Sequence, residues 1–152
     1  MRGDDPDRST ICTGTFELPL APEHALRLFT PEGERSWVPG WAPRYPAPGT
    51  PSADPGRVFL TQGDRGDTTW VVTRASGSMM GYARVDPRGL VGTVEVACSE
   101  AGRGRTTVEV TYRLTALDRE SGGELADFAA GFDAYLERWR EALCAAIERG
   151  DA

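Results

Sequence analysis

Proton transfer is the chemistry that this sequence could support with its own side chains, because the residue types for most other reactions are scarce. All 17 basic side chains are arginine, so neither a lysine Schiff base nor a phosphate-loop lysine is available. Histidine occurs once, so a His-based metal cluster is excluded, and a His-assisted nucleophile would need His24 itself in the site. General acid–base work would therefore fall to carboxyl, tyrosine and arginine groups. The candidates are Glu34, Arg35, Tyr82, Arg84, Tyr112, Asp133 and Tyr135.

These candidates show no spacing that a particular reaction demands, so the sequence assigns no catalytic residue. Glu34 and Arg35 are adjacent, and on a helix their side chains point about 100° apart, which favours one inward and one solvated group. The three cysteines, Cys12, Cys98 and Cys144, lack a Cys-x-x-Cys spacing, which favours small buried hydrophobes over disulfides or a zinc site. We expect no metal and no cofactor.

Length and charge define the broad class of the protein. A chain of 152 residues suits one domain, which we expect over residues 10–150 after a disordered acidic tail over residues 1–9. Residues 1–8 lack the order of a secretory signal, and no apolar run reaches the roughly 18 residues of a membrane span, so we expect a cytoplasmic protein. The net charge of −6 argues against nucleic acid and anionic membranes, since both need a basic patch. Monomer and homodimer both stay open.

Alternating apolar residues and glycine-containing turns predict an antiparallel sheet. Thr10–Leu20 reads as a first strand, and Pro22 then suits the start of a short helix over Pro22–Phe29. Thr30 is a capping residue for a second short helix. The segment Val38–Gly56 contains six prolines and no periodicity, which is typical of a lid, a binding loop or disorder. The remaining strands are expected at Arg57–Gln62, Thr68–Ser76, Met79–Asp86, Leu90–Ser99 and Arg105–Leu117.

The alternation also predicts which strand residues face the core. It is clearest in the last strand, where the inward residues are expected to be Val108, Val110, Tyr112 and Leu114. Val94 and Val96 face inward if Glu95 faces outward. Weaker alternation leaves the orientation of three further residues open: Phe59, Met80 and Tyr82.

A turn at Ser121-Gly122-Gly123 is expected to lead into one long amphipathic helix that ends near Arg149. Its apolar stripe repeats every three or four residues and consists of Leu125, Phe128, Phe132, Leu136, Trp139, Leu143 and Ile147. Burying each large side chain contributes ~1.5–3 kcal/mol before ordering entropy is subtracted, so the stripe must pack on the sheet. Gly131 costs ~1 kcal/mol relative to alanine inside a helix, which points to close packing or a bend, although a tolerated glycine fits equally well.

A family resemblance covers about residues 10–149. It rests on the stretches Phe16-Glu17-Leu18-Pro19, Leu28-Phe29-Thr30-Pro31-Glu32-Gly33-Glu34-Arg35, Trp37-Val38-Pro39-Gly40-Trp41, Thr69-Trp70-Val71-Val72 and Val110-Thr111-Tyr112-Arg113-Leu114-Thr115-Ala116-Leu117. These stretches resemble bacterial members of the SRPBCC superfamily, which includes START-like lipid-transfer domains, pollen-allergen-type proteins, polyketide cyclases and aromatases. The resemblance implies an α+β helix-grip fold. Such a fold has a curved antiparallel sheet of six to seven strands wrapped on a long C-terminal helix, with two short helices after strand one.

The resemblance also implies a deep, mostly apolar cavity between the sheet and the C-terminal helix. The ligand-binding residues would be Trp37, Trp41, Trp70, Tyr82, Val94, Val96, Val108, Val110, Tyr112, Phe128 and Phe132. Such a lining suits a flat, hydrophobic, partly oxygenated molecule. The alternative is that these side chains fill the core, and that Trp37 and Trp41 anchor the proline-rich loop.

Three functions remain open at this point, since one fold hosts many. The first is noncatalytic binding of a small hydrophobic molecule that is aromatic, polyketide-like or a lipid. The second is a cyclase or aromatase-like enzyme of polyketide metabolism. The third is a protein-interaction module, or a self-resistance protein that sequesters a natural product. A composition with arginine as its only long basic residue and no asparagine suggests a GC-rich, bacterial genome.

Overall fold

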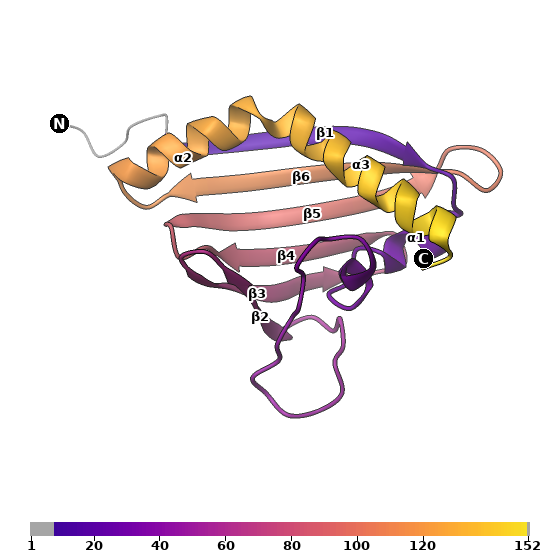
Figure 1. Cartoon of the computed structure of the whole chain (residues 1–152), viewed down its shortest axis with the longest axis horizontal. Helices are drawn as coiled ribbons and strands as arrows, with labels where there is room; N and C mark the ends of the chain where they lie inside the picture. Colours follow the sequence, from indigo (N-terminus) through magenta and orange to yellow (C-terminus); the bar gives the residue numbers. More distant parts are fainter. Residues whose placement is uncertain (1–7, 152) are drawn as a thin grey trace.

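A curved antiparallel sheet forms one layer of the molecule, and two helices cross one face of it (Figure 1). The computed structural model describes residues 8–151. Within that range the sheet has six strands in the order β1-β6-β5-β4-β3-β2, so the first strand pairs with the last. The strands are β1 (Ser9–Leu18), β2 (Val58–Gly63), β3 (Gly66–Ala75), β4 (Met79–Val85), β5 (Leu90–Glu100) and β6 (Thr106–Ala116). The predicted antiparallel meander is confirmed.

The face of the sheet under the helices carries the core. On β6 every second residue is buried, from Thr106 to Ala116, and the inward orientation predicted for Val108, Val110, Tyr112 and Leu114 is confirmed. Val94 and Val96 on β5 are also buried. The three residues whose orientation was open, Phe59, Met80 and Tyr82, all lie in the core.

Two short helices follow β1, as expected. They are α1 (Pro22–Arg27) and the 3-10 helix η2 (Gly33–Ser36). Thr30 lies between them, where its Oγ1 donates to the Arg27 carbonyl at 2.8 Å and accepts from the Gly33 N–H at 2.9 Å. Thr30 thus fixes the turn, and the second helix begins later than its sequence signals indicate.

The C-terminal helix differs from the prediction in two places. It consists of α2 (Arg119–Ala130) and α3 (Phe132–Arg149), and Gly131 separates the two. The turn predicted at Ser121-Gly122-Gly123 is wrong, because these residues lie in the first turns of α2. Asp118 is the N-cap: its Oδ1 accepts from the Ser121 N–H at 2.9 Å, while the Ser121 Oγ accepts from the Asp118 N–H at 3.1 Å. This reciprocal pair starts the helix before the two glycines.

The remaining expectations concern the chain ends and the loop. Residues 1–7 lie outside the described range, and Ser9, expected in the tail, is the first residue of β1. The tip of the proline-rich loop, residues 46–51, is exposed and extends beyond β2 (Figure 1). Among residues 8–151 no helix is long and apolar enough to cross a membrane.

Candidate ligand cavity

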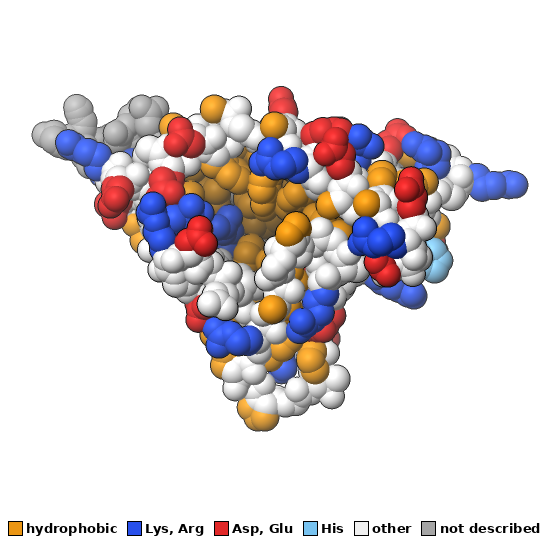
Figure 2. Space-filling view, in the orientation of Figure 1, with side chains coloured by type: hydrophobic (Ala, Val, Ile, Leu, Met, Phe, Trp, Pro, Cys, Tyr) orange, Lys and Arg blue, Asp and Glu red, His pale blue; other side chains and the backbone are white. Residues whose placement is uncertain are grey.

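A cavity of about 150 Å³ lies between the sheet and the elements that cover it. Its floor is formed by strand residues Phe59, Trp70, Tyr82, Arg84, Val94, Val96 and Tyr112. Its roof is formed by Glu34, Val38, Trp41, Tyr135 and Trp139. Figure 2 shows the hollow near the centre of the view, with hydrophobic side chains inside it and charged side chains at its rim. The volume is below the roughly 300–1,000 Å³ typical of pockets for drug-sized ligands.

Strand register sets the order of the floor residues. Phe59 pairs with Trp70, and Trp70 with Arg84, so these three side chains form one row across β2, β3 and β4. In a second row across β4, β5 and β6, Tyr82 pairs with Val94, and Val94 pairs with Tyr112. The floor therefore has Phe59, Trp70 and Tyr82 on one side and Tyr112 on the other, with Val94 between Tyr82 and Tyr112.

The aromatic rings at one side of the cavity pack against one another. Phe59 and Trp70 stack with their planes 3° apart and their centroids 5.9 Å apart. Trp41 meets both edge-on, at 6.1 Å from Phe59 and 5.7 Å from Trp70. Tyr82 also meets this stack edge-on. Such contacts hold flat surfaces in place with little rotamer freedom.

Most N–H and hydroxyl groups of these aromatic side chains already have hydrogen-bond partners. The Trp70 indole N–H donates to the Thr61 hydroxyl at 2.9 Å, and the Tyr82 hydroxyl donates to the Phe29 carbonyl at 2.5 Å. The hydroxyls of Tyr112 and Tyr135 lie 3.2 Å apart and share a hydrogen bond. Burial, followed by the neighbouring Tyr135, raises the pKa of Tyr112 well above its ordinary value, so the Tyr112 hydroxyl stays neutral.

Glu34 is the exception, since its carboxyl group has no hydrogen-bond or salt-bridge partner among residues 8–151. Burial raises the pKa of this carboxyl well above its ordinary value. The neighbouring Arg35 points outward and pairs with Glu32, with 2.7 Å between Arg35 Nε and Glu32 Oε1. η2 thus separates the two adjacent charges, as their spacing on a helix predicts.

Arg84 is the second polar group of the cavity. Its Nη2 lies 2.7 Å from Asp86 Oδ2, and its guanidinium carbon lies 5.4 Å from the centre of a Trp70 ring. Its Nε is buried and has no hydrogen-bond partner within the described chain. Only 12% of the Arg84 side chain is exposed, so this cation is largely removed from bulk water.

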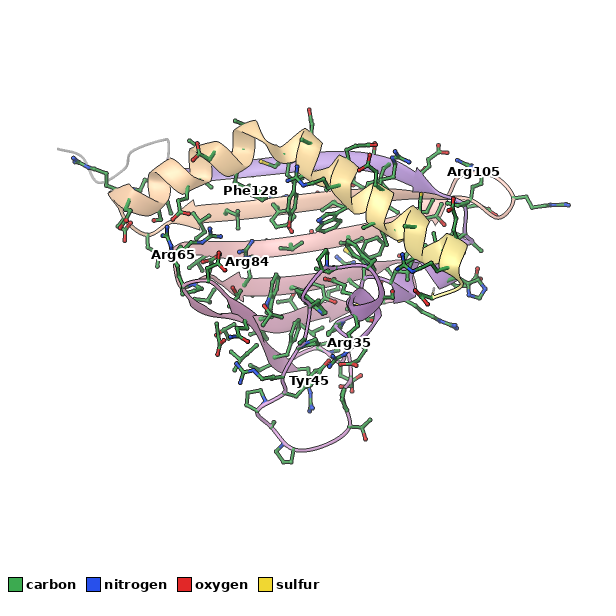
Figure 3. The ribbon with its side chains drawn as sticks, in the orientation of Figure 1. Arg35, Tyr45, Arg65, Arg84, Arg105 and Phe128 are labelled. Carbon is green, nitrogen blue, oxygen red and sulfur yellow. The ribbon has the colours of Figure 1, made fainter. Side chains whose placement is uncertain are left out.

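A network of charges continues from Arg84 to the rim of the cavity. Arg88 also pairs with Asp86, and both Arg88 and Arg65 reach Glu124 on α2 at 3.2 and 3.3 Å. Burial acts to raise the pKa of Asp86, but hydrogen bonds from Arg88 and the charges of Arg84 and Arg88 lower it overall. Asp86 is therefore an anion that two guanidinium groups share. Figure 3 labels Arg65 and Arg84, which both lie towards this end of the sheet in the view.

The structure brings part of the predicted ligand-binding set to the cavity wall: Trp41, Trp70, Tyr82, Val94, Val96 and Tyr112. It places the others outside that wall. Trp37 is in the core, where its indole N–H donates to the Leu28 carbonyl at 2.7 Å and its ring contacts Phe29 and Trp139. The side chains of Val108 and Val110 are fully buried. Phe128 and Phe132 pack on Tyr112 and Tyr135 (Figure 3 labels Phe128).

Sequence reasoning did not assign several lining residues to ligand binding: Glu34, Val38, Phe59, Arg84, Tyr135 and Trp139. A signal existed for Tyr135 and Trp139, because residues four apart on a helix share a face. Among residues 8–151 no three His, Cys, Asp or Glu side chains come together as a metal site would require.

The sheet, the crossing helices and the cavity between them match the helix-grip class, and comparison with solved structures establishes that fold. One similar structure is a norcoclaurine synthase point mutant from Thalictrum flavum in complex with a transition-state analogue. It has a TM-score of 0.65 and 7% identity, and the match covers 95% of this chain and 97% of that one. CalU16 from Micromonospora echinospora has a TM-score of 0.61 and 16% identity, with 94% of each chain covered.

Protein MLL2253 from Mesorhizobium loti has a TM-score of 0.64 and 15% identity, with 88% of this chain and 96% of that chain covered. Identities this low establish the fold alone. Neither a protein-family model nor a curated protein sequence matches the chain. Function must therefore be argued from the cavity.

Proposed function

We propose that this protein binds a small aromatic molecule in the cavity between the sheet and α3, without converting it. The observation that carries the proposal is a hollow with aromatic rings on both walls, Trp70 and Tyr112 below and Trp41 and Trp139 above. Rings on both walls offer an aromatic ligand flat surfaces for stacking and ring edges for edge-to-face contacts. Few polar groups then remain to orient it, as is usual in ligand sites.

The volume of the cavity limits the size of the ligand to about one aromatic ring. A cavity of about 150 Å³ lined by apolar side chains in another protein binds benzene. A multi-ring polyketide or a long acyl chain needs more room, so binding either would require the walls to move apart. Among the ligand types open from sequence, a single-ring aromatic therefore fits best.

A second function, catalysis of proton transfer, is favoured by Glu34. Its carboxyl group lines the cavity without a partner, and burial moves its pKa upward towards the range where a general acid or base works best. Tyr112 and Tyr135, with their hydroxyls 3.2 Å apart, would complete a proton path. An enzyme of this kind would consume its ligand, whereas a binding protein returns it unchanged.

The location, oligomeric state and partners that we propose are those expected from the sequence. We propose a cytoplasmic bacterial protein that acts as a monomer or homodimer on a small molecule and does not bind nucleic acid. The net charge of −6 supports the last point.

The test is calorimetric titration with single-ring aromatics, together with chromatography of the mixture after incubation. Val94→Phe fills the cavity and should abolish binding, while Val91→Phe alters a partly exposed position on the other face of β5 and should leave it intact. Recovery of unchanged ligand supports a binder, and a new product supports the enzyme. Equal binding by both valine variants would place the ligand elsewhere and refute the proposal.

A further inference from the structure

Two polar groups in the cavity lack a complete set of partners, and they come from different parts of the fold. Glu34 belongs to η2 in the roof, and Arg84 belongs to β4 in the floor. Among residues 8–151 no salt bridge joins Glu34 to Arg84. The cavity wall therefore contains a carboxyl pole, Glu34, and a guanidinium pole, Arg84, and the rest of its lining consists of aromatic rings and valine side chains.

The guanidinium pole is short of negative charge. Arg84 and Arg88 share Asp86, and Arg88 and Arg65 share Glu124, so three cations in this network pair with two carboxylates. Asp86 is 4% exposed and already accepts from both arginines, which leaves it little capacity for more. Nη1 of Arg84 makes no hydrogen bond within the described chain. A ligand anion or strong acceptor at this end would balance the charge and use the remaining donors.

The carboxyl pole has the opposite requirement. Glu34 makes no hydrogen bond to any residue in the range 8–151 and has no cation beside it. A carboxyl group in such surroundings both donates and accepts when protonated. A ligand hydroxyl satisfies both roles at once, whereas a second anion here would face repulsion whenever Glu34 ionises.

Resting on the proposed aromatic-binding function, we propose that the ligand is a single-ring aromatic acid with a second polar substituent, of the hydroxybenzoate class. Its carboxylate lies against Arg84, and its hydroxyl lies against Glu34. The ring occupies the space between Trp70 and Tyr112 below and Trp41 above.

The test uses four probes of nearly equal size: p-xylene, p-cresol, 4-methylbenzoate and 4-hydroxybenzoate. They carry neither pole, the hydroxyl alone, the carboxylate alone, and both. Calorimetry at pH 7 should show 4-hydroxybenzoate binding about ten-fold or more tightly than either single-pole probe, because a hydrogen bond to a charged or buried group is worth about that much. Equal affinities for all four would overturn this inference and leave the proposed function standing. No binding by any probe would instead overturn the proposed function.

Matched variants assign each pole. Arg84→Gln should remove the tighter binding of the two probes that carry a carboxylate, a loss of about ten-fold or more, while Arg113→Gln should keep it. The Arg113 variant is the control because Arg113 is exposed on the outer face of β6 and does not line the cavity. If Arg84→Gln does not fold, Arg84→Lys keeps the cation and should reduce carboxylate binding several-fold through loss of the planar fork. An equal loss in the Arg113 and Arg84 variants would overturn the assignment.

The carboxyl pole is tested in the same way. Glu34→Met should make 4-hydroxybenzoate bind no more tightly than 4-methylbenzoate, and Glu34→Gln should restore the preference because an amide also donates and accepts. Glu32→Gln is the control, since Glu32 lies outside the cavity and pairs with Arg35. A hydroxyl preference that survives in Glu34→Met would overturn the role of Glu34.

Discussion

Replacing Glu34 with glutamine should stabilise the protein, and the gain should grow as pH rises. In the folded state the Glu34 side chain is half-buried and its carboxyl group has no hydrogen-bond partner in the described chain, and this burial raises the pKa of the carboxyl well above its ordinary value. Between the unfolded pKa, about 4.3, and the folded pKa, the folded state holds a proton that the unfolded state has lost. The wild-type protein therefore loses stability as pH rises through this window, by at most about 1.4 kcal/mol per pH unit for one proton. Glutamine does not titrate and escapes this loss.

The assay is urea unfolding of both proteins at several values from pH 4 to pH 8. The difference in unfolding free energy, Glu34→Gln minus wild type, should rise from acid pH and level off once Glu34 ionises in the folded protein. A difference that is constant across this range would refute the reasoning, because it would mean that the Glu34 carboxyl titrates alike in both states.

Glu32→Gln is a control whose effect on stability should depend on pH in the opposite way. A hydrogen bond from Arg35 has the largest effect on the pKa of Glu32 and lowers it below its ordinary value; partial burial opposes this shift, and a hydrogen bond from Tyr45 adds a smaller lowering. Its contribution is present above the unfolded pKa and is lost as pH falls through the folded pKa. Glu32→Gln should therefore destabilise at neutral pH and have less effect in acid. The change should be small, about 0–1 kcal/mol, because this pair is exposed.

Three further outcomes are expected. Asp118→Ala removes the cap bonded to Ser121 and should lower the unfolding free energy by about 1 kcal/mol in urea titration; an unchanged value would show that the cap is dispensable. Replacing residues 47–51 with two glycines should preserve both the melting temperature and aromatic binding, since this tip is exposed; loss of binding alone would identify a lid. Tyr112→Phe should cost about 0.5–1.5 kcal/mol of stability through the lost bond to Tyr135, and a cost near zero would argue against that bond.

Most of the sheet could be predicted from the sequence because each strand has one covered face. In β6, Val110 and Tyr112 alternate with polar residues, and a shift of one residue would turn every apolar side chain outward. In β4 the alternation is weaker, since Gly81 and Ala83 separate the inward residues from one another without polar contrast. The orientation of Tyr82 therefore depends on its partner across the chain, the Phe29 carbonyl, which no local pattern contains.

The start of α2 was misjudged because two glycines outweighed a better local signal. Gly122 and Gly123 each cost about 1 kcal/mol in a helix, which favours a turn at that position. Asp118 and Ser121 form a capping pair that begins the helix earlier, and the fully covered Leu125 adds burial energy. The cost of the glycines is therefore offset by tertiary packing, which the sequence of that segment alone does not reveal.

The cavity itself is harder to predict than its walls, because its volume depends on one side chain. Removing a single large side chain from a core leaves a void of roughly 150 Å³, which is the size of this cavity. Alternation predicts that Val94 and Tyr112 face inward but not whether a roof ring reaches down between them. Trp37 and Trp41 illustrate the limit: they lie four residues apart on one irregular segment, yet Trp37 is bonded to the Leu28 carbonyl in the core while Trp41 lines the cavity.

What keeps the space open is the way in which the rings are fixed. Trp41 bonds to the Pro31 carbonyl at 2.8 Å and Trp70 to Thr61 at 2.9 Å, so neither ring can turn inward without losing a hydrogen bond. Leaving such a buried donor unpaired costs about 1–3 kcal/mol, more than the few contacts that collapse into the void would regain. These two anchoring bonds therefore keep the cavity from collapsing. Removing one, as in Thr61→Val, should let the Trp70 ring move, weaken aromatic binding in calorimetry and lower the unfolding free energy by about 1–3 kcal/mol. Unaltered affinity would show that the rings hold their places by packing alone.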